Sequence, residues 1–175
     1  MKLKPTESMS AGVVLERRKI DNPWQDYAGH PVAVIPGAPP VTEWRVLRQG
    51  EGWVHYHAGT LEIELYRKET EGYRVNLAQA QPRVFVVLRP DEEDESGHDV
   101  VPFLVTVCPF EAQDYDDTDE EMVGGVPMPD EVIAWVQDFV DEHHVDVPFK
   151  KRKREPYDPR KGGFARNPGR GGSHE

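Results

Sequence analysis

The fold class is indicated first by the stretch LEIELY, residues 61–66, in which every second residue from Leu61 to Leu65 is apolar and the residues between them are glutamates. A period of two is typical of a β-strand with one buried face. Further along the chain, mostly apolar runs at residues 84–88 and 100–108 indicate strands that are covered on both faces. The chain holds 22 Val against 8 Leu, and branching at Cβ favours strands over helices.

About eight short strands are predicted in all. The others are expected at residues 13–15, 32–35, 44–47, 53–57 and 73–77, with a hairpin turn at residues 58–60. Short strands at close spacing favour a curled antiparallel sheet, a barrel or a sandwich. The predicted fold class is therefore mainly β, of the α+β type, with a C-terminal helix packed on the sheet.

Two helices are predicted after the strands. Residues 109–113 suit the start of a short helix, because proline stands early and an acidic residue lies in the first turn. The clearest helix spans residues 130–144, and side chains four residues apart form its apolar stripe: Val132, Val136 and Val140. Trp135 and Phe139 flank this stripe, and burying each should contribute about 1.5–3 kcal/mol.

Charge divides the 175 residues into two parts. Residues 150–175 hold nine basic and three acidic residues, a net charge of +6, whereas residues 1–149 hold twelve basic and 29 acidic residues, a net charge of −17. We expect an acidic β-rich domain over residues 1–149. Residues 150–175 are rich in Pro and Gly and poor in apolar residues, which predicts a basic tail that is disordered when alone.

Several classes of protein are excluded by composition. No apolar run approaches the ~18 residues that a membrane-spanning helix needs, and the first apolar stretch is too short for a secretory signal. A single cysteine, Cys108, excludes an internal disulfide and any site built from several cysteines. We therefore expect a cytoplasmic protein with no membrane span and no bound cofactor.

Acidic residues are concentrated in two segments, with six between Asp91 and Asp99 and seven between Glu111 and Glu121. Solvated loops would explain them, but opposite charges on body and tail favour an electrostatically steered protein partner. The acidic body argues against nucleic acid. The predicted contact residues are Asp91, Glu92, Glu93, Asp94, Asp116, Asp117, Asp119, Glu120, Lys150, Lys151, Arg152, Lys153 and Arg154.

A metal site is an alternative interpretation of His55, His57 and Glu62. Two histidines two residues apart on a strand share one face, and a nearby carboxylate can complete a ligand set. The string resembles the first metal motif of cupin barrels, although its glycine stands one residue too close and the second cupin motif is missing. Histidines on the polar face of a strand are the simpler explanation of the pattern, and no catalytic residues are identified.

Several strings together resemble a family of uncharacterised proteobacterial proteins, over residues 11–162. They include VLERRKIDNPWQDY at 14–27, PFLVTVCPFEAQDY at 102–115 and VPMPDEVIAWVQDFVDEHHVDVPFKKRKR at 126–154. Genes of that family tend to lie beside those for molybdenum-dependent formate dehydrogenase and its maturation factors. The resemblance implies a non-catalytic accessory or protein-interaction factor in assembly of that enzyme or a related redox complex. A cupin-like metal-binding barrel and a stable structural subunit of a larger redox complex remain the alternatives.

Overall fold

The computed structural model describes residues 4–23, 27–93 and 97–145, which belong to one compact unit ending at Val145. Its strands are β1 (Glu7–Lys19), β2 (Tyr27–Pro36), β3 (Arg45–Gly50), β4 (Trp53–Leu65), β5 (Arg83–Pro90), β6 (Val100–Thr106) and β7 (Met122–Pro127). Its helices are the 3-10 turn η1 (Arg67–Glu69), α1 (Thr70–Leu77), α2 (Pro109–Asp116) and α3 (Asp130–His143). The basic tail and its predicted disorder lie outside the described residues.

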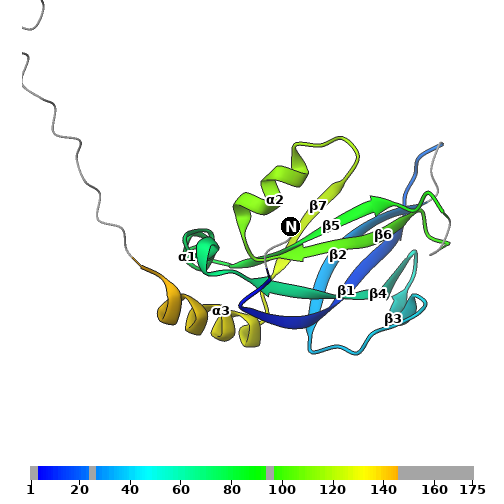
Figure 1. Cartoon of the computed structure of the whole chain (residues 1–175). Helices are drawn as coiled ribbons and strands as arrows, with labels where there is room; N and C mark the ends of the chain where they lie inside the picture. The colour runs from blue at the N-terminus through cyan, green and yellow to red at the C-terminus, as the bar shows by residue number, and fades with distance from the viewer. Residues whose placement is uncertain (1–3, 24–26, 94–96, 146–175) are drawn as a thin grey trace, which may run out of the picture. The chain divides into compact units, whose positions relative to one another are not determined.

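The strands form two antiparallel sheets (Figure 1). Sheet A has the order β2-β1-β4-β3, and sheet B has the order β6-β5-β7. Every pair of neighbouring strands is antiparallel. The predicted mainly β, α+β class is therefore confirmed, with two sheets that do not close into a barrel.

The two sheets meet along two seams, where β4 lies beside β6 and β2 lies beside β7. At each seam a proline faces a glycine: Pro102 of β6 packs against Gly59 of β4, and Pro31 of β2 packs against Gly124 of β7. Of these four strands, β2, β6 and β7 are sheet edges, and β4 lies inside sheet A. Proline is tolerated on an edge strand because its missing amide hydrogen interrupts no ladder there.

The core lies between the sheets and is built largely from the valines that the sequence singled out. Alternate residues of β1 and β5 point into it, and its strand residues include Val13 and Leu15 of β1, Ile63 and Leu65 of β4, and Val84, Val86 and Leu88 of β5. On the opposite face of sheet B, α2 packs against β5 and β7 and buries Ala112. The predicted short helix at residues 109–113 is thus confirmed and reaches Asp116.

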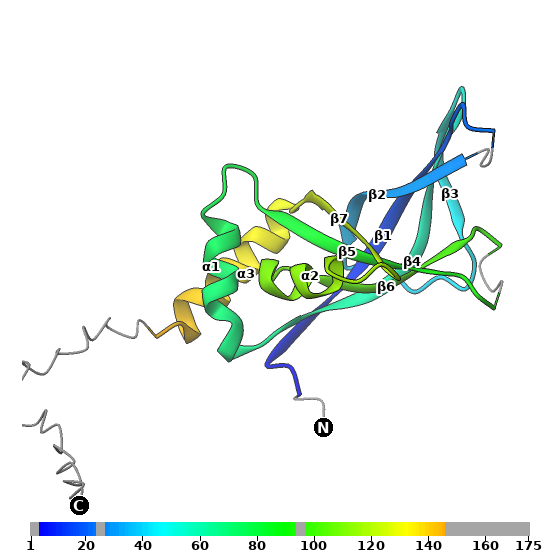
Figure 2. The same ribbon diagram turned by 90° about the horizontal axis from the view of Figure 1, so that it is seen from above.

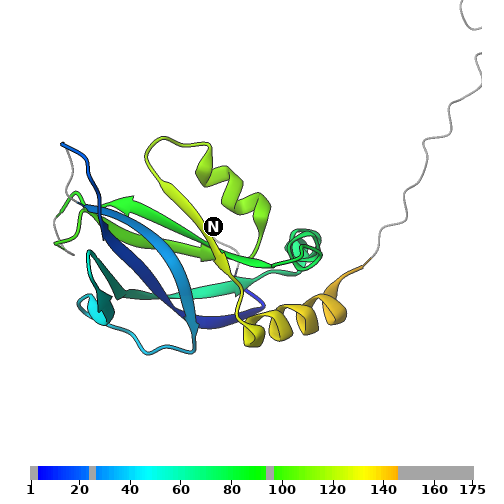
Figure 3. The same ribbon diagram turned by 180° about the vertical axis from the view of Figure 1, so that it is seen from behind.

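Helix α3 lies at one end of the strands beside α1, and β3 lies at the other end (Figures 2 and 3). The predicted apolar stripe is confirmed, because Val132, Val136 and Val140 are buried together with Phe139. Trp135 is only partly buried. None of the helices in the described part of the chain is both long enough and apolar enough to cross a membrane.

The predicted strand at residues 73–77 is wrong, because these residues belong to helix α1. Tyr73 and Leu77 are four residues apart, so their spacing fits a helix as well as a strand. The side-chain hydrogen bonds of Asn76 favour the helix over the strand. Its side-chain amide donates to the carbonyls of Arg83 and Val107, 2.7 and 2.8 Å away, and its carbonyl accepts from the Arg83 amide.

The predicted hairpin turn at residues 58–60 is also wrong, because β4 runs without a break through these residues. The register of β4 against β1 shifts between Gly59 and His57, so Ala58 is the extra residue of a β-bulge. The small residues that indicated a turn therefore mark a bend within one long strand. Strand β7, with its two glycines, was not predicted.

Candidate functional site

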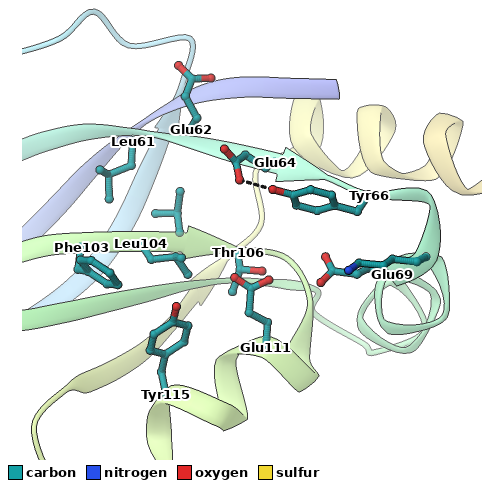
Figure 4. Close-up of a pocket in the computed structure, with 12 residues that line it drawn as sticks. Leu61, Glu62, Glu64, Tyr66, Glu69, Phe103, Leu104, Thr106, Glu111 and Tyr115 are labelled. Atoms are coloured by element: carbon teal, nitrogen blue, oxygen red, sulfur yellow. Dashed lines mark hydrogen bonds between the residues drawn. The ribbon is translucent and has the colours of Figure 1, made fainter. Parts of the chain in front are cut away.

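A cavity of about 430 Å³ opens at the seam between β4 and β6 (Figure 4). Strand β4 and η1 supply one wall, and β6 and the first turns of α2 supply the other. Its acidic lining residues are Glu62, Glu64, Glu69 and Glu111, and Lys68 is the only basic one among the described residues. Leu61, Phe103 and Leu104 add an apolar wall. We call this cavity the acidic pocket.

Strand alternation explains why β4 contributes glutamates here. Ile63 and Leu65 are fully buried in the core, so Glu62 and Glu64 point to the opposite face. The pattern that predicted this strand therefore also placed two carboxylates at the seam. What the sequence did not predict is that Glu69 and Glu111, from η1 and α2, point into the same space (Figure 4).

Two tyrosines hold two of the carboxylates in place. The Tyr66 hydroxyl donates to Glu64 Oε2 at 2.6 Å, and this bond, with burial, raises the pKa of Tyr66 to about 12. The buried Tyr73 hydroxyl donates to Glu69 Oε2 at 3.0 Å and accepts from the Tyr66 amide at 2.9 Å. Burial raises the pKa of Tyr73 far above its ordinary value. Both phenols therefore remain neutral donors to carboxylates at physiological pH.

Glu111 lies in surroundings that disfavour its ionised form. Burial raises the pKa of Glu111, and the nearby charge of Glu69 raises it further, while a hydrogen bond with Thr106 opposes both effects. A second cavity of about 430 Å³ adjoins the first, shares Glu69 and Glu111, and adds Glu71 and Asp114. Within the described part of the chain, Lys68 is again the only basic residue that lines it. A cationic group would relieve the repulsion among these carboxylates.

The substitution Glu111→Gln is expected to stabilise the protein at neutral pH. Because the pKa of Glu111 is raised on folding, the folded state binds more protons than the unfolded state above pH 4.5, and stability falls as pH rises through that window. Glutamine cannot ionise. Thermal unfolding should therefore show a higher Tm for the variant near pH 7.5 and no gain near pH 4. If wild type and variant had the same Tm at pH 7.5 as well as at pH 4, ionisation of Glu111 would cost no stability, which would contradict the prediction.

The three predicted metal ligands lie on one face of β4 but have separate partners. His55 Nε2 donates to Glu16 Oε2 at 2.7 Å, and Glu62 accepts from Ser10 Oγ at 2.7 Å. His57 Nε2 lies 2.9 Å from Thr60 Oγ1, which donates to the Pro39 carbonyl. Nε2 of His57 must then carry the hydrogen. The structure does not bring His55, His57 and Glu62 together around one point.

Another triplet does come together within the described ranges. The ligand atoms of Glu7, Glu142 and His143 lie within 4.8 Å of one another, the single such group of three found there. Both carboxylates are exposed, and Glu7 is already close to the Trp135 indole, 3.3 Å away.

Cys108 is buried, and burial raises the pKa of its thiol, which agrees with a packing role.

A charge network on sheet A was missed by the sequence analysis. Glu16 of β1 is nearly buried and accepts from Arg18 Nε and from His55 Nε2, each at 2.7 Å. His30 of β2 lies 3.7 Å from the same carboxylate. Hydrogen bonds from Arg18 and His55 lower the pKa of Glu16 to about 2. Strand pairing places Glu16 between His30 and His55, and nothing local in the sequence shows that pairing.

The predicted partner-binding residues fall into three groups. Asp91, Glu92 and Glu93 lie after β5, and Asp116, Asp117, Asp119 and Glu120 lie at the end of α2 and in the turn that follows. All are exposed except Asp91, which is partly buried. The α2 group follows Tyr115, which lines the acidic pocket. Asp94 and Lys150, Lys151, Arg152, Lys153 and Arg154 lie outside the described residues.

Comparison with known proteins identifies a family and no individual relative. No curated protein and no solved structure gives a significant match to the chain. One family model, described as a protein of unknown function (DUF3305), matches residues 10–153. That match spans all the strands except the start of β1, together with all the helices. The chain therefore belongs to the DUF3305 family of proteins of unknown function.

Proposed function

We propose that the protein is a non-catalytic interaction factor that accepts a basic side chain of a partner protein in the acidic pocket. The observation that supports this proposal is the charge of the lining: among the described residues, four glutamates and one lysine line this cavity, and Glu64, Glu69 and Glu111 point into it (Figure 4). Tyr66 and Tyr73 orient Glu64 and Glu69 as acceptors, and burial together with the charge of Glu69 raises the pKa of Glu111, so a cation beside it would favour its ionised form.

An arginine of the partner suits the chemistry of this cavity best. A guanidinium donates in a planar fork that matches carboxylates, and charge-assisted hydrogen bonds are among the stronger ones. The aliphatic part of the side chain would pack on Leu61, Phe103 and Leu104. The volume of about 430 Å³ lies within the range of about 300–1,000 Å³ that ligand pockets occupy.

The finer proposal is a role in assembly of a molybdenum-dependent formate dehydrogenase or a related redox complex. Its support is the resemblance of the chain to a family encoded beside such enzymes. The exposed acidic residues at the end of α2 continue from the acidic pocket through Tyr115, so a basic partner segment would contact both. The predicted contact residues Asp116, Asp117, Asp119 and Glu120 belong to this proposal.

The test is affinity capture of the tagged full-length chain from its host at low ionic strength, followed by identification of bound proteins. Wild type should retain a formate dehydrogenase subunit or maturation factor, and about 0.5 M salt should release it. The double variant Glu64→Gln and Glu111→Gln should retain about tenfold less, which corresponds to about 1.4 kcal/mol.

The matched control is the double variant Glu131→Gln and Asp138→Asn, which removes two exposed acidic charges from α3, away from both cavities. It should capture as much partner as wild type. Equal losses in both double variants would indicate a non-specific effect of net charge. Unchanged capture by the Glu64→Gln and Glu111→Gln variant would remove the acidic pocket from the interaction.

A further inference from the structure

We propose that the free edge of β3 binds an extended, acidic segment of a partner protein as an additional strand of sheet A. The inference rests on the topology and on side chains remote from the acidic pocket, so it stands or falls separately from the proposed function. It begins with the edges of the two sheets, because an unpaired edge exposes backbone N–H and C=O groups that can pair with another chain.

Three of the four sheet edges already have a strand of the other sheet beside them. Strand β2 lies beside β7 at the Pro31–Gly124 contact, and β6 lies beside β4 at the Gly59–Pro102 contact. Strand β3 pairs on one side with the first half of β4, between Trp53 and His57. Within the described residues, β3 is therefore the sheet edge that no other strand covers.

The side chains of β3 discourage pairing with a like-charged strand but leave the edge accessible to an acidic one. All six residues from Arg45 to Gly50 are exposed. Val46 and Leu47 are 51% and 40% exposed, which is unusual for apolar side chains on a free edge. Natural edges are commonly protected by proline, by charged side chains or by a β-bulge, and β3 has the last two. Two exposed arginines, Arg45 and Arg48, flank the apolar pair, and the register shift at Leu47 places both arginines on one face of the strand.

Charge identifies the kind of partner. In the β3–β4 register, Arg45 lies opposite His57 and Arg48 lies opposite His55, so two arginines share one face at this end of sheet A although the chain as a whole has a net charge of −11. Glu16 of β1, opposite His55 in the β1–β4 register, is already bonded to Arg18 and His55. Acidic side chains at alternate positions of an added strand would face Arg45 and Arg48.

A second copy of the chain fits this edge less well. Antiparallel pairing of two β3 strands that matches Val46 with Leu47 would set Arg45 of one copy opposite Arg48 of the other. Like charges directly opposite each other destabilise a strand pair. An acidic segment that adds a strand gains the same backbone hydrogen bonds without that repulsion, which is the recognition mode called β-augmentation.

The test measures backbone amide exchange of the full chain with two synthetic eight-residue peptides, one alternating Glu and Val and the other alternating Lys and Val. The Glu–Val peptide should slow exchange of amides within residues 45–50 by at least about tenfold. The Lys–Val peptide should not. Arg45→Glu with Arg48→Glu should abolish the protection, because the acidic peptide would then meet like charges.

The variant Glu64→Gln with Glu111→Gln should keep the full protection of residues 45–50, which separates this site from the acidic pocket. Absence of protection with the Glu–Val peptide would overturn the proposal. So would protection that persists in the Arg45→Glu, Arg48→Glu variant. Protection that grows with protein concentration in the absence of peptide would show that a second copy occupies the edge, and would overturn it too.

Discussion

Phe139→Ala is expected to lower the free energy of unfolding by about 3–5 kcal/mol, the usual cost of deleting a buried aromatic side chain. Phe139 is 1% exposed. Its ring centroid lies 6.0 Å from that of Tyr73 on α1 and 4.5 Å from that of His143. It therefore joins α3 to α1 at the end of the core, where no strand could refill the space. The residual cavity adds to the lost transfer free energy.

Denaturant unfolding followed by far-UV circular dichroism measures this loss. Trp135→Ala is the matched control, since Trp135 lies on the same helix but is only partly buried and holds the Glu7 carboxylate at 3.3 Å. We expect it to cost about 1–2 kcal/mol, less than the sequence-based expectation of full burial implied. A Phe139→Ala loss below about 1 kcal/mol would mean that α3 does not seal the core.

Glu16→Gln is expected to cost about 2–3 kcal/mol at pH 7. The pKa of Glu16 falls from 4.5 to about 2 on folding, because Arg18 and His55 donate hydrogen bonds to its carboxylate. Each unit of pKa shift corresponds to about 1.4 kcal/mol of differential stability. The Glu16 side chain is only 10% exposed, so water screens these bonds weakly. Glutamine keeps the shape but leaves Arg18 without its counter-charge.

The pH dependence identifies the cause of that loss. Since the folded pKa is depressed, the contribution of Glu16 is fully present above about pH 4.5 and is lost as pH falls towards 2. The stability difference between wild type and Glu16→Gln should therefore shrink over that interval. Glu62→Gln, which alters an exposed carboxylate bonded to Ser10, serves as control and should change stability by less than about 0.5 kcal/mol. If the stability lost in Glu16→Gln did not depend on pH, the cause would be altered packing rather than the lost charge.

Local pattern predicted those elements whose burial follows a simple period. The stripe of Val132, Val136 and Val140 predicted α3 to within one residue, and the apolar run at 84–88 lies within β5. The two errors have a common origin. Residues 58–60 and 73–77 take their conformation from partners distant in sequence, namely β1 for the bulge at Ala58 and the Val107 carbonyl for Asn76.

The acidic pocket could be predicted only in part for the same reason. Alternation along β4 placed Glu64 opposite the core, whereas Glu69 lies between the runs predicted as strands at residues 61–66 and 73–77 and carried no prediction. Their meeting with Glu111 depends on the seam between β4 and β6, which joins residues about forty positions apart. The Glu16 network depends likewise on pairing of β1 with both β2 and β4. Patterns along the sequence do not reveal which strands pair with one another.

Binding of a basic side chain in the acidic pocket is tested most directly by an NMR titration of the side-chain carboxyl carbons with a penta-arginine peptide at about 0.15 M salt. We expect the signals of Glu64, Glu69 and Glu111 to shift together and the pKa of Glu111 to fall as the peptide saturates, and we expect Glu64→Gln with Glu111→Gln to remove the shift of Glu69. Shifts confined to the exposed acids at residues 91–93 and 116–120, with Glu111 unchanged, would contradict it.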